Sequence, residues 1–137
     1  MTWVKKDDQY PLNRKIRKLT DAEYRLDDSA MCWSARNGTD GHIPPDELPF
    51  VSEVRNPTPA AAGLVKKERW HQPGHDCKSE YCRPIEDGWL IHDYLDYNPT
   101  AETIQKRRQE RAQAGQRGGR NSSKRRANLK AVGEANA

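Results

Sequence analysis

The chain has 137 residues and a mass of 15.7 kDa, with 34% hydrophobic and 32% charged residues. This length fits one domain with appendages, and the low apolar content allows only a small core, which a structural metal often supplements. The sequence contains no apolar run of membrane-span length and no signal-peptide pattern, so we expect a cytoplasmic protein without a membrane partner.

The formal net charge of +4 conceals two regions of opposite charge. Residues 106–137 contain ten Lys and Arg but only two acidic residues, whereas residues 1–105 contain fourteen basic and eighteen acidic residues. A mildly acidic body with a basic tail is typical of a protein that meets a polyanion through its tail. A tail that merely increases solubility is the alternative, although such surfaces usually mix both signs of charge.

Two short elements are expected before residue 20. Residues 2–5 predict a strand with Trp3 as its core anchor, and Pro11 opens a short helix over residues 11–19.

The first long helix has clear signals at both ends. Thr20 and Glu23 have the spacing of a capping box, and Gly38 is a typical helix terminator. We therefore predict a helix from about residue 20 to 37. Asp27 and Asp28 fall away from its apolar stripe, so we expect both carboxylates to face solvent.

Shorter elements follow this helix. Residues 42–43 predict a very short extended piece, and residues 46–52 a short helix. After a Pro-rich break, Thr58 is the expected cap of a helix over residues 58–69.

Four potential metal ligands follow that helix in the spacing H-x3-H-x-C-x4-C: His71, His75, Cys77 and Cys82. Two imidazoles and two thiolates can close a tetrahedral zinc site. We therefore predict a structural Zn2+ here, with His42 or His92 as possible replacements for one ligand. A Cys77–Cys82 disulfide and an unliganded polar loop are the alternatives, and a catalytic zinc is not expected, because four close ligands leave no open position.

The turn pair Asp87-Gly88 opens a strand over residues 88–94. The ligands thus lie between the 58–69 helix and a returning strand, which predicts a β-hairpin wing whose loop is clamped by zinc.

Thr100 predicts the start of a last, basic helix over residues 100–113. Residues 114–137 are rich in Gly, Ser, Asn and Arg, and we expect them to be disordered. Residues 1–99 would form the folded domain, with the zinc loop at 71–82.

The predicted elements are a strand, helices, a short extended piece, two helices separated by a break, and a hairpin, which is the order found in a winged helix-turn-helix domain. The expected fold is therefore α+β and mainly helical, with the 58–69 helix in the recognition position.

Six segments resemble a group of small actinobacterial and actinophage proteins. They are TWVK (2–5), LTDA (19–22), ARNGTDG (35–41), AGL (62–64), GW (88–89) and IHDYLDYNPT (91–100). Those proteins look like replication-initiator or DnaD-like winged-helix DNA-binding proteins, and related chains carry a Trp-His…Gly-His-Asp-Cys…Cys loop. The resemblance covers roughly residues 1–120 and implies a phage or prophage protein that binds DNA in a bacterial host cell.

The leading functional hypothesis is a DNA-binding protein that acts in replication initiation or transcriptional control. Lys66, Lys67 and Arg69 would contact phosphates or base edges from the 58–69 helix. The basic tail would add sequence-independent affinity through counterion release. The expected tail contacts are Arg107, Arg108, Arg111, Arg117, Arg120, Lys124, Arg125 and Arg126.

The second hypothesis is a zinc-stabilised adaptor that docks a host or phage replication or transcription protein, while the tail holds nucleic acid. An enzyme is not expected, because neither a nucleophile–base pair nor a Glu at metalloenzyme spacing is visible, and no small-molecule substrate is predicted.

Overall fold

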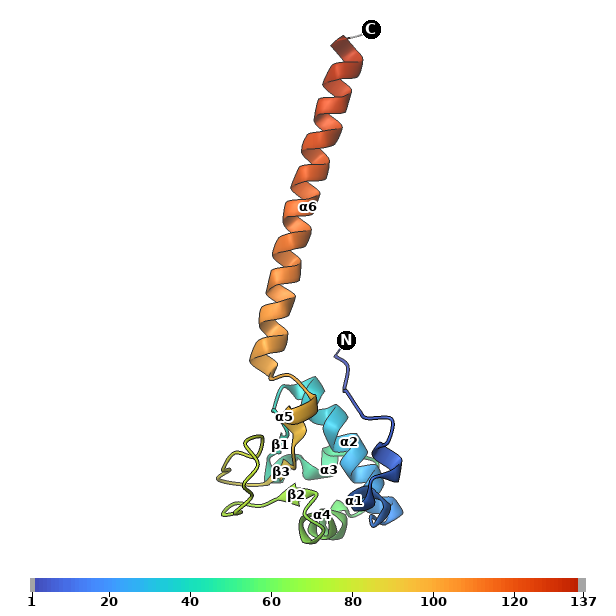
Figure 1. The fold of residues 1–137 in the computed structure, drawn as a ribbon, viewed down its shortest axis with the longest axis vertical. Coiled ribbons are helices and arrows are strands. Elements are labelled where there is room, and N and C mark those ends of the chain that lie inside the picture. Colours follow the sequence, from blue (N-terminus) through green and yellow to red (C-terminus); the bar gives the residue numbers. More distant parts are fainter. Residues whose placement is uncertain (1, 136–137) are drawn as a thin grey trace. The chain divides into compact units, whose positions relative to one another are not determined.

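The computed structural model describes residues 2–135, and the chain divides into two units after Ala101. The first unit combines short helices with a three-stranded antiparallel sheet (Figure 1). The predicted class, α+β and mainly helical, is therefore confirmed. The helices are η1 (Tyr10–Leu12), α1 (Arg14–Arg17), α2 (Asp21–Asn37), η2 (Pro45–Glu47), α3 (Leu48–Val51), α4 (Pro57–Lys66), α5 (Tyr94–Tyr97) and α6 (Ala101–Ala135), and the strands are β1 (His42–Ile43), β2 (Trp70–His71) and β3 (Trp89–Ile91).

The two ends of α2 follow from local sequence. Thr20 Oγ1 accepts a hydrogen bond from the Glu23 N–H at 3.2 Å, and Gly38 ends the helix with φ 66°. Glycine adopts this left-handed conformation without a steric penalty. Both predicted boundaries are confirmed. The Glu23 carboxylate, however, is bound by Lys67 Nζ at 2.7 and 2.8 Å, instead of completing the capping box.

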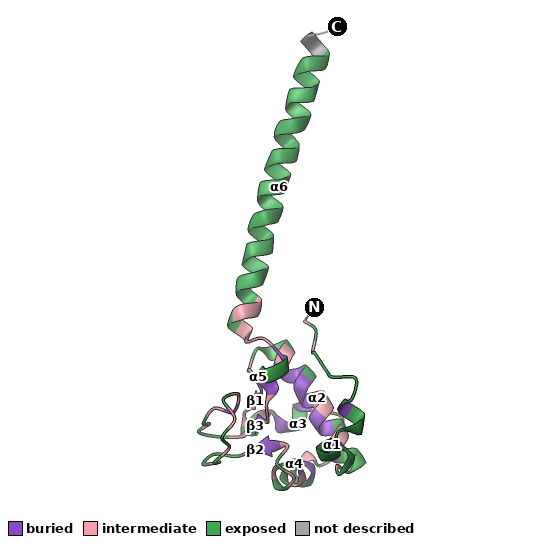
Figure 2. Ribbon diagram, viewed as in Figure 1, coloured by how far each residue is buried: buried purple, intermediate pink, exposed green. Residues whose placement is uncertain are grey.

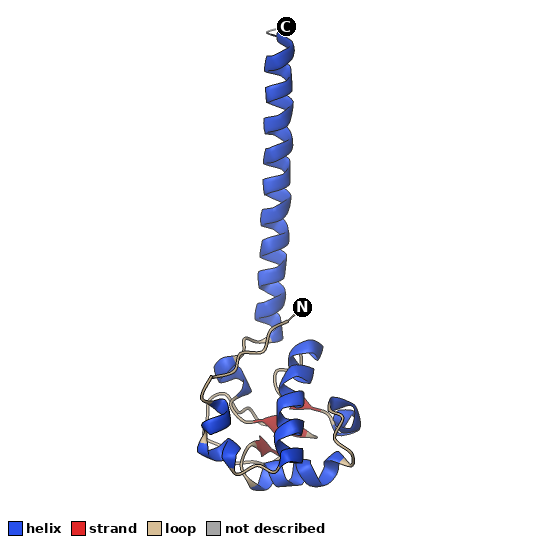
Figure 3. Cartoon of the chain, turned by 90° about the vertical axis from the view of Figure 1, so that its right-hand side faces the viewer, coloured by secondary structure: helices blue, strands red, loops and turns tan. Residues whose placement is uncertain are grey.

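Strand β3 lies in the middle of the sheet (Figure 3), and the helices of the first unit pack against one face of it. Its register pairs Leu90 with both His42 and His71, and Ile91 with Trp70. Trp70 and Ile91 belong to the core that the helices pack. Because side chains alternate along a strand, His71 and Leu90 point to the opposite face of the sheet.

The antiparallel pairing of the predicted hairpin is confirmed, since β2 and β3 are neighbours joined by residues 72–88, but β3 ends at Ile91 instead of residue 94 and α4 at Lys66 instead of residue 69. Gly88 ends that loop with φ 66°, and a Cβ there would lie 2.0 Å from the Ile43 carbonyl oxygen. No larger residue fits this turn without moving β1. His42 Nε2 also lies 3.0 Å from both the carbonyl oxygen and Oδ1 of Asp87. The end of the loop is thereby fixed to β1.

The predicted N-terminal strand is wrong. Residues 2–7 have no regular structure, and Trp3 is 80% exposed rather than a core anchor. The Lys5 N–H instead donates to Asn98 Oδ1 at 3.0 Å, and Lys6 pairs with Asp28, so side-chain contacts hold this segment where a strand ladder was expected.

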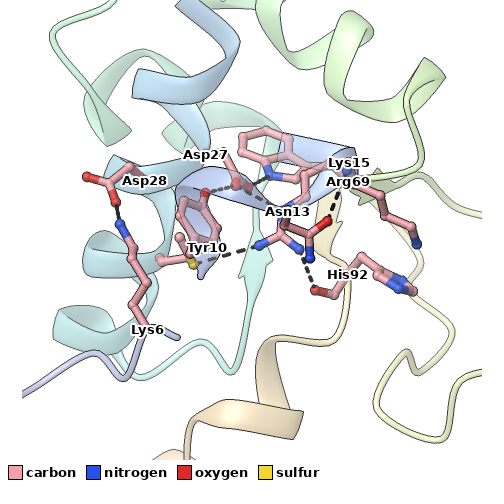
Figure 4. A network of polar contacts seen from close by, with 10 residues as sticks. Lys6, Tyr10, Asn13, Lys15, Asp27, Asp28, Arg69 and His92 are labelled. Carbon is pink, nitrogen blue, oxygen red and sulfur yellow. Dashed lines mark hydrogen bonds and ion pairs between the residues drawn. The ribbon is translucent and has the colours of Figure 1, made fainter. Parts of the chain in front are cut away.

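A buried carboxylate on α2 joins three segments of the first unit (Figure 4). Asp27 is fully buried and accepts hydrogen bonds from Tyr10 Oη at 2.6 Å, Trp70 Nε1 at 2.9 Å and Arg69 Nε at 2.9 Å. The expectation that this carboxylate faces solvent is wrong, because three donors replace its hydration. Asp28, in contrast, is half-exposed and pairs with Lys6.

The Asp27 carboxylate shifts the pKa values of the two ionisable groups that donate to it, Tyr10 and Arg69. Burial, together with the charge of Asp27, raises the pKa of Tyr10. Burial alone would lower the pKa of Arg69, but the ion pair with Asp27 outweighs it and raises that pKa. Both groups therefore remain protonated donors at neutral pH.

The structure differs from the prediction for the C-terminal region. Helix α6 continues to Ala135 instead of ending near residue 113, so residues 114–135 are helical rather than disordered. The side chains of residues 105–133 are all exposed (Figure 2). Gly115, Gly118 and Gly119 lie within it, and each lowers helix stability by about 1 kcal/mol relative to Ala. The helix therefore depends on its own backbone hydrogen bonds.

Within residues 2–135, none of the helices combines the length and the apolar character that crossing a membrane requires.

Asp27→Ala should lower the free energy of unfolding by about 3–5 kcal/mol, because it leaves the Arg69 guanidinium buried without its counterion. Asp28→Ala removes a carboxylate from the next position of the same helix and should cost no more than about 1 kcal/mol, since its ion pair is exposed to solvent. Urea unfolding of the two variants and of the unmodified protein gives the three free energies of unfolding that are compared. Equal losses would show that the Asp27 network does not stabilise the fold.

Candidate metal centre

Four side chains of the hairpin converge on one point: His71, Cys77, Cys82 and His92, whose ligand atoms all lie within 4.8 Å of one another. Three of the four predicted ligands are therefore brought together. His92 takes the place that was predicted for His75.

The strand register explains why His92 joins the group. His71 pairs with Leu90, and His92 follows two positions later, so it continues the same side-chain alternation. The His92 N–H donates to the Arg69 carbonyl at 2.9 Å, which extends the pairing of the two strands by one residue. Diagonal neighbours on one face of an antiparallel pair are close enough for long side chains to meet. The two imidazoles therefore meet on the face that points away from the helical core.

The spacing of the donor atoms suits a small cation. His92 Nδ1 lies 2.9 Å from His71 Nε2, 3.3 Å from Cys82 Sγ and 3.7 Å from Cys77 Sγ. A tetrahedral ion with bonds of about 2.0–2.3 Å separates its ligands by roughly 3.3–3.8 Å. The two imidazoles would have to move apart, and pairs near the 4.8 Å upper limit would have to move closer, for all four atoms to bind one ion.

A carboxylate behind the cluster orients its second histidine. Asp93 Oδ2 lies 3.0 Å from His92 Nε2, and its other carboxylate oxygen accepts a hydrogen bond from Ser79 Oγ. The Asp93 N–H points to Cys82 Sγ at 3.3 Å, and the residue has φ 54°. A carboxylate bound to the outer nitrogen of a ligating histidine fixes the ring and its tautomer. Asp93 thus has contacts with both a nitrogen donor and a sulfur donor.

His75 lies beside the cluster but organises the loop instead of completing the set. Its ring stacks on that of His71, with centroids 4.5 Å apart. Its Nε2 lies 3.0 Å from the Arg83 carbonyl oxygen, and its Nδ1 accepts the Cys77 N–H at 3.3 Å. Both nitrogens therefore contact loop backbone, and His75 lies outside the group of four side chains that could hold a metal ion.

Arg83 ties the loop to the rest of the first unit. Its guanidinium donates to the carbonyl oxygens of Thr39 at 3.1 Å and Asp40 at 2.8 Å, between α2 and β1. The cysteine-bearing loop is thus anchored at several points.

Burial controls the protonation of the donors. Burial and the repulsion of His75 and His92 lower the pKa of His71 to about 4, so its ring is neutral at pH 7. Burial also lowers the pKa of His92. The Cys82 thiol, in contrast, has its pKa raised by burial to about 11. A cation that binds here would displace the thiol protons, as it does at other cysteine sites.

The predicted DNA contacts near α4 are mostly engaged inside the protein. Lys66 is exposed. Lys67 forms an ion pair with Glu23, and Arg69 is held by Asp27 with only 15% of its side chain exposed. The predicted tail contacts all lie on α6 and are exposed.

Comparison with models of known families, with curated proteins and with solved structures finds no match. The cluster of four potential metal ligands and the distribution of charge are therefore the observations that bear on function.

The ligand set can be tested by single substitutions. Cys82→Ser and His92→Ala should each lose the bound metal and lower the melting temperature, because binding energy in such sites is folding energy. His75→Ala and the exposed Cys32→Ser should each keep one ion per chain. Elemental analysis of protein purified without chelators measures the number of metal ions per chain. If His75→Ala lost the metal and His92→Ala retained it, the ligands would be those predicted from the sequence, with His75 in place of His92.

Asp93→Asn keeps the shape of the side chain but removes the charge behind His92, and should weaken metal affinity about tenfold or more. Asp96→Asn is the matched control, since Asp96 is exposed on the neighbouring turn. Competition with a chromophoric chelator gives both affinities. Equal affinity in the two variants would mean that the carboxylate does not support the centre.

Proposed function

We propose that the protein is a winged-helix DNA-binding protein whose wing is stabilised by a structural zinc ion and whose affinity comes mainly from α6. The observation that carries the proposal is the exposed concentration of positive charge on α6. Ten Lys and Arg lie between residues 106 and 130, with Glu110 as the only acidic residue in that range.

Zinc is the metal that best suits the donor set of the hairpin. Two imidazole nitrogens and two thiols, one of them buried, are a common structural zinc combination. Four protein ligands leave no position for a substrate, so the ion would stabilise the fold and would not act in catalysis.

The order of elements supports a winged helix. Helix α2, strand β1, helices α3 and α4 and the β2–β3 hairpin follow one another in that order, with β1 added to the hairpin as a third strand. In such a domain α4 occupies the recognition position and residues 72–88 form the wing.

The exposed side of α4, however, offers little for reading bases. Thr58, Pro59, Ala62 and Lys66 are its exposed residues, and only Lys66 is charged. The internal ion pairs of Lys67 and Arg69 make the other two cations unsuitable for base contacts. Sequence-independent contacts from α6 therefore account for DNA binding better than base recognition by α4.

The arrangement of charge on α6 suits a polyanion that surrounds the helix. Successive helical residues point about 100° apart, so Lys106, Arg107 and Arg108 cover three sides of one turn. Such a helix has no apolar stripe for a coiled coil or a membrane surface. The B-DNA major groove admits an α-helix between two phosphate backbones, whereas that of A-form RNA is too narrow, which favours DNA.

The adaptor hypothesis is retained for the wing. The loop exposes Asp76, Glu80, Glu86 and Asp87, which would repel phosphate. A protein partner of the replication or transcription apparatus would suit this surface better than DNA. We propose that the wing docks such a partner while α6 holds DNA.

Lys124→Gln, Arg125→Gln and Arg126→Gln combined should flatten the slope of log affinity against log salt by about 0.9 for each phosphate that the helix no longer neutralises. Gln has a helix propensity close to that of Lys and Arg, so charge is the main change. Gln113→Ala with Gln116→Ala is the neutral control on the same helix. A salt titration on duplex DNA that gives identical slopes for both variants would exclude α6 as the binding element.

A further inference from the structure

A second cationic surface lies on the first unit, around α1. Arg14, Lys15, Arg17 and Lys18 are all exposed, and none has an ion pair with any residue in the range 2–135. Like charges three and four positions apart on a helix repel one another. Binding of a polyanion would relieve this repulsion.

A cavity of about 330 Å³ adjoins this surface, and Lys15 contributes to both. Lys5 of the N-terminal segment and Arg69 also line it, together with the rings of Tyr10 and Tyr97. Pockets that bind small organic groups begin at about this volume. The cavity is therefore large enough for one ring system among cationic side chains.

Two of the lysines that face this cavity have no ion pair with any described residue. Arg69 is neutralised by Asp27, and Lys6, which also lines the cavity, by Asp28. The Asp93 carboxylate also lines the cavity, and its contacts are with Ser79 and with His92, whose pKa burial lowers, so no cation among residues 2–135 offsets it.

Asp7 is the remaining acidic residue of the lining, and its carboxylate accepts the Gln9 N–H at 2.8 Å. Lys5 and Lys15 form no ion pair with any described residue, and they balance Asp7 and Asp93, so the excess positive charge of this region comes from Arg14, Arg17 and Lys18 on the adjoining surface.

Exposed aromatic rings accompany these lysines. Tyr97 lines the cavity and is 54% exposed. Trp3 is 80% exposed and lies two residues before Lys5, whose N–H binds Asn98, the neighbour of Tyr97. Proteins that bind single strands combine a cationic groove with rings on which bases stack.

We propose that this cavity binds an unpaired nucleotide of a single-stranded nucleic acid. The base would stack on Tyr97, Lys5 and Lys15 would hold its phosphates, and the exposed basic side chains of α1 would follow the adjoining backbone. A base inside a duplex is stacked and paired, so it cannot enter without being extruded. This surface is separate from the duplex contacts proposed for α6 and does not depend on them.

The experiment uses the full chain and a labelled oligothymidylate of about 10 nucleotides, with a duplex of equal length for comparison. Lys5→Ala with Lys15→Ala should raise the single-strand Kd about tenfold or more in fluorescence anisotropy, and the duplex Kd less than about twofold. Arg25→Ala with Arg36→Ala is the matched control, because it removes two exposed charges from α2. This control should leave the single-strand Kd within about twofold.

Tyr97→Ala should raise the single-strand Kd by about fivefold or more, whereas Tyr97→Phe should stay within about twofold, since phenylalanine retains the stacking face. An unchanged Kd in Tyr97→Ala, or in the double lysine variant, would overturn the inference. Equal weakening of single-strand and duplex binding would also overturn it, because a phosphate patch alone would then explain the data. The α6 glutamine variant, measured on duplex, reports separately on the proposed function.

Discussion

The structure of the first unit depends on one buried carboxylate. Asp27 receives a phenol from η1, an indole from β2 and a guanidinium that precedes β2. Removing a charge from water is costly, and three hydrogen bonds with one counterion offset that cost. A chain with so few apolar residues uses this polar centre to fix the position of the N-terminal helices and the hairpin relative to α2. The hydrophobic contacts of Leu26, Ala30 and Trp70 surround it.

Local sequence patterns correctly predicted several helix ends and turns, although the cap predicted at Thr58 is wrong, because α4 begins at Pro57. The cap at Thr20, the terminator Gly38 and the turn at Gly88 are each set by a few neighbouring residues, and all three were correctly placed. Asp27 was misassigned because its donors come from positions 10, 69 and 70. Helical periodicity describes which side of α2 is apolar, but it contains no information on distant hydrogen-bond partners.

The candidate metal ligands also include some that sequence spacing can identify and one that only the pairing of the strands brings close. Spacing along the chain identified His71, Cys77 and Cys82, because loop ligands are close in sequence. The choice between His75 and His92 needed the pairing of β2 with β3, which places residue 92 diagonally across from residue 71. The alternation of side chains, applied to both strands of the hairpin together, predicts that His92 lies beside His71. The α6 helix was underestimated for another reason: its Gly and Ser content indicates disorder.

Arg69, Trp70 and His71 are consecutive, yet the first two bind the Asp27 carboxylate and the third belongs to the metal cluster. One tripeptide therefore joins the polar centre of the core to the candidate metal site, where a bound ion would add to the stability of the fold. A ligand that binds only the native state stabilises it by RT ln(1 + [L]/Kd), or about 2.7 kcal/mol at a hundredfold excess over Kd. The fraction of folded protein in a cell would then follow the free metal concentration, and starvation for the metal would leave the chain open to proteases.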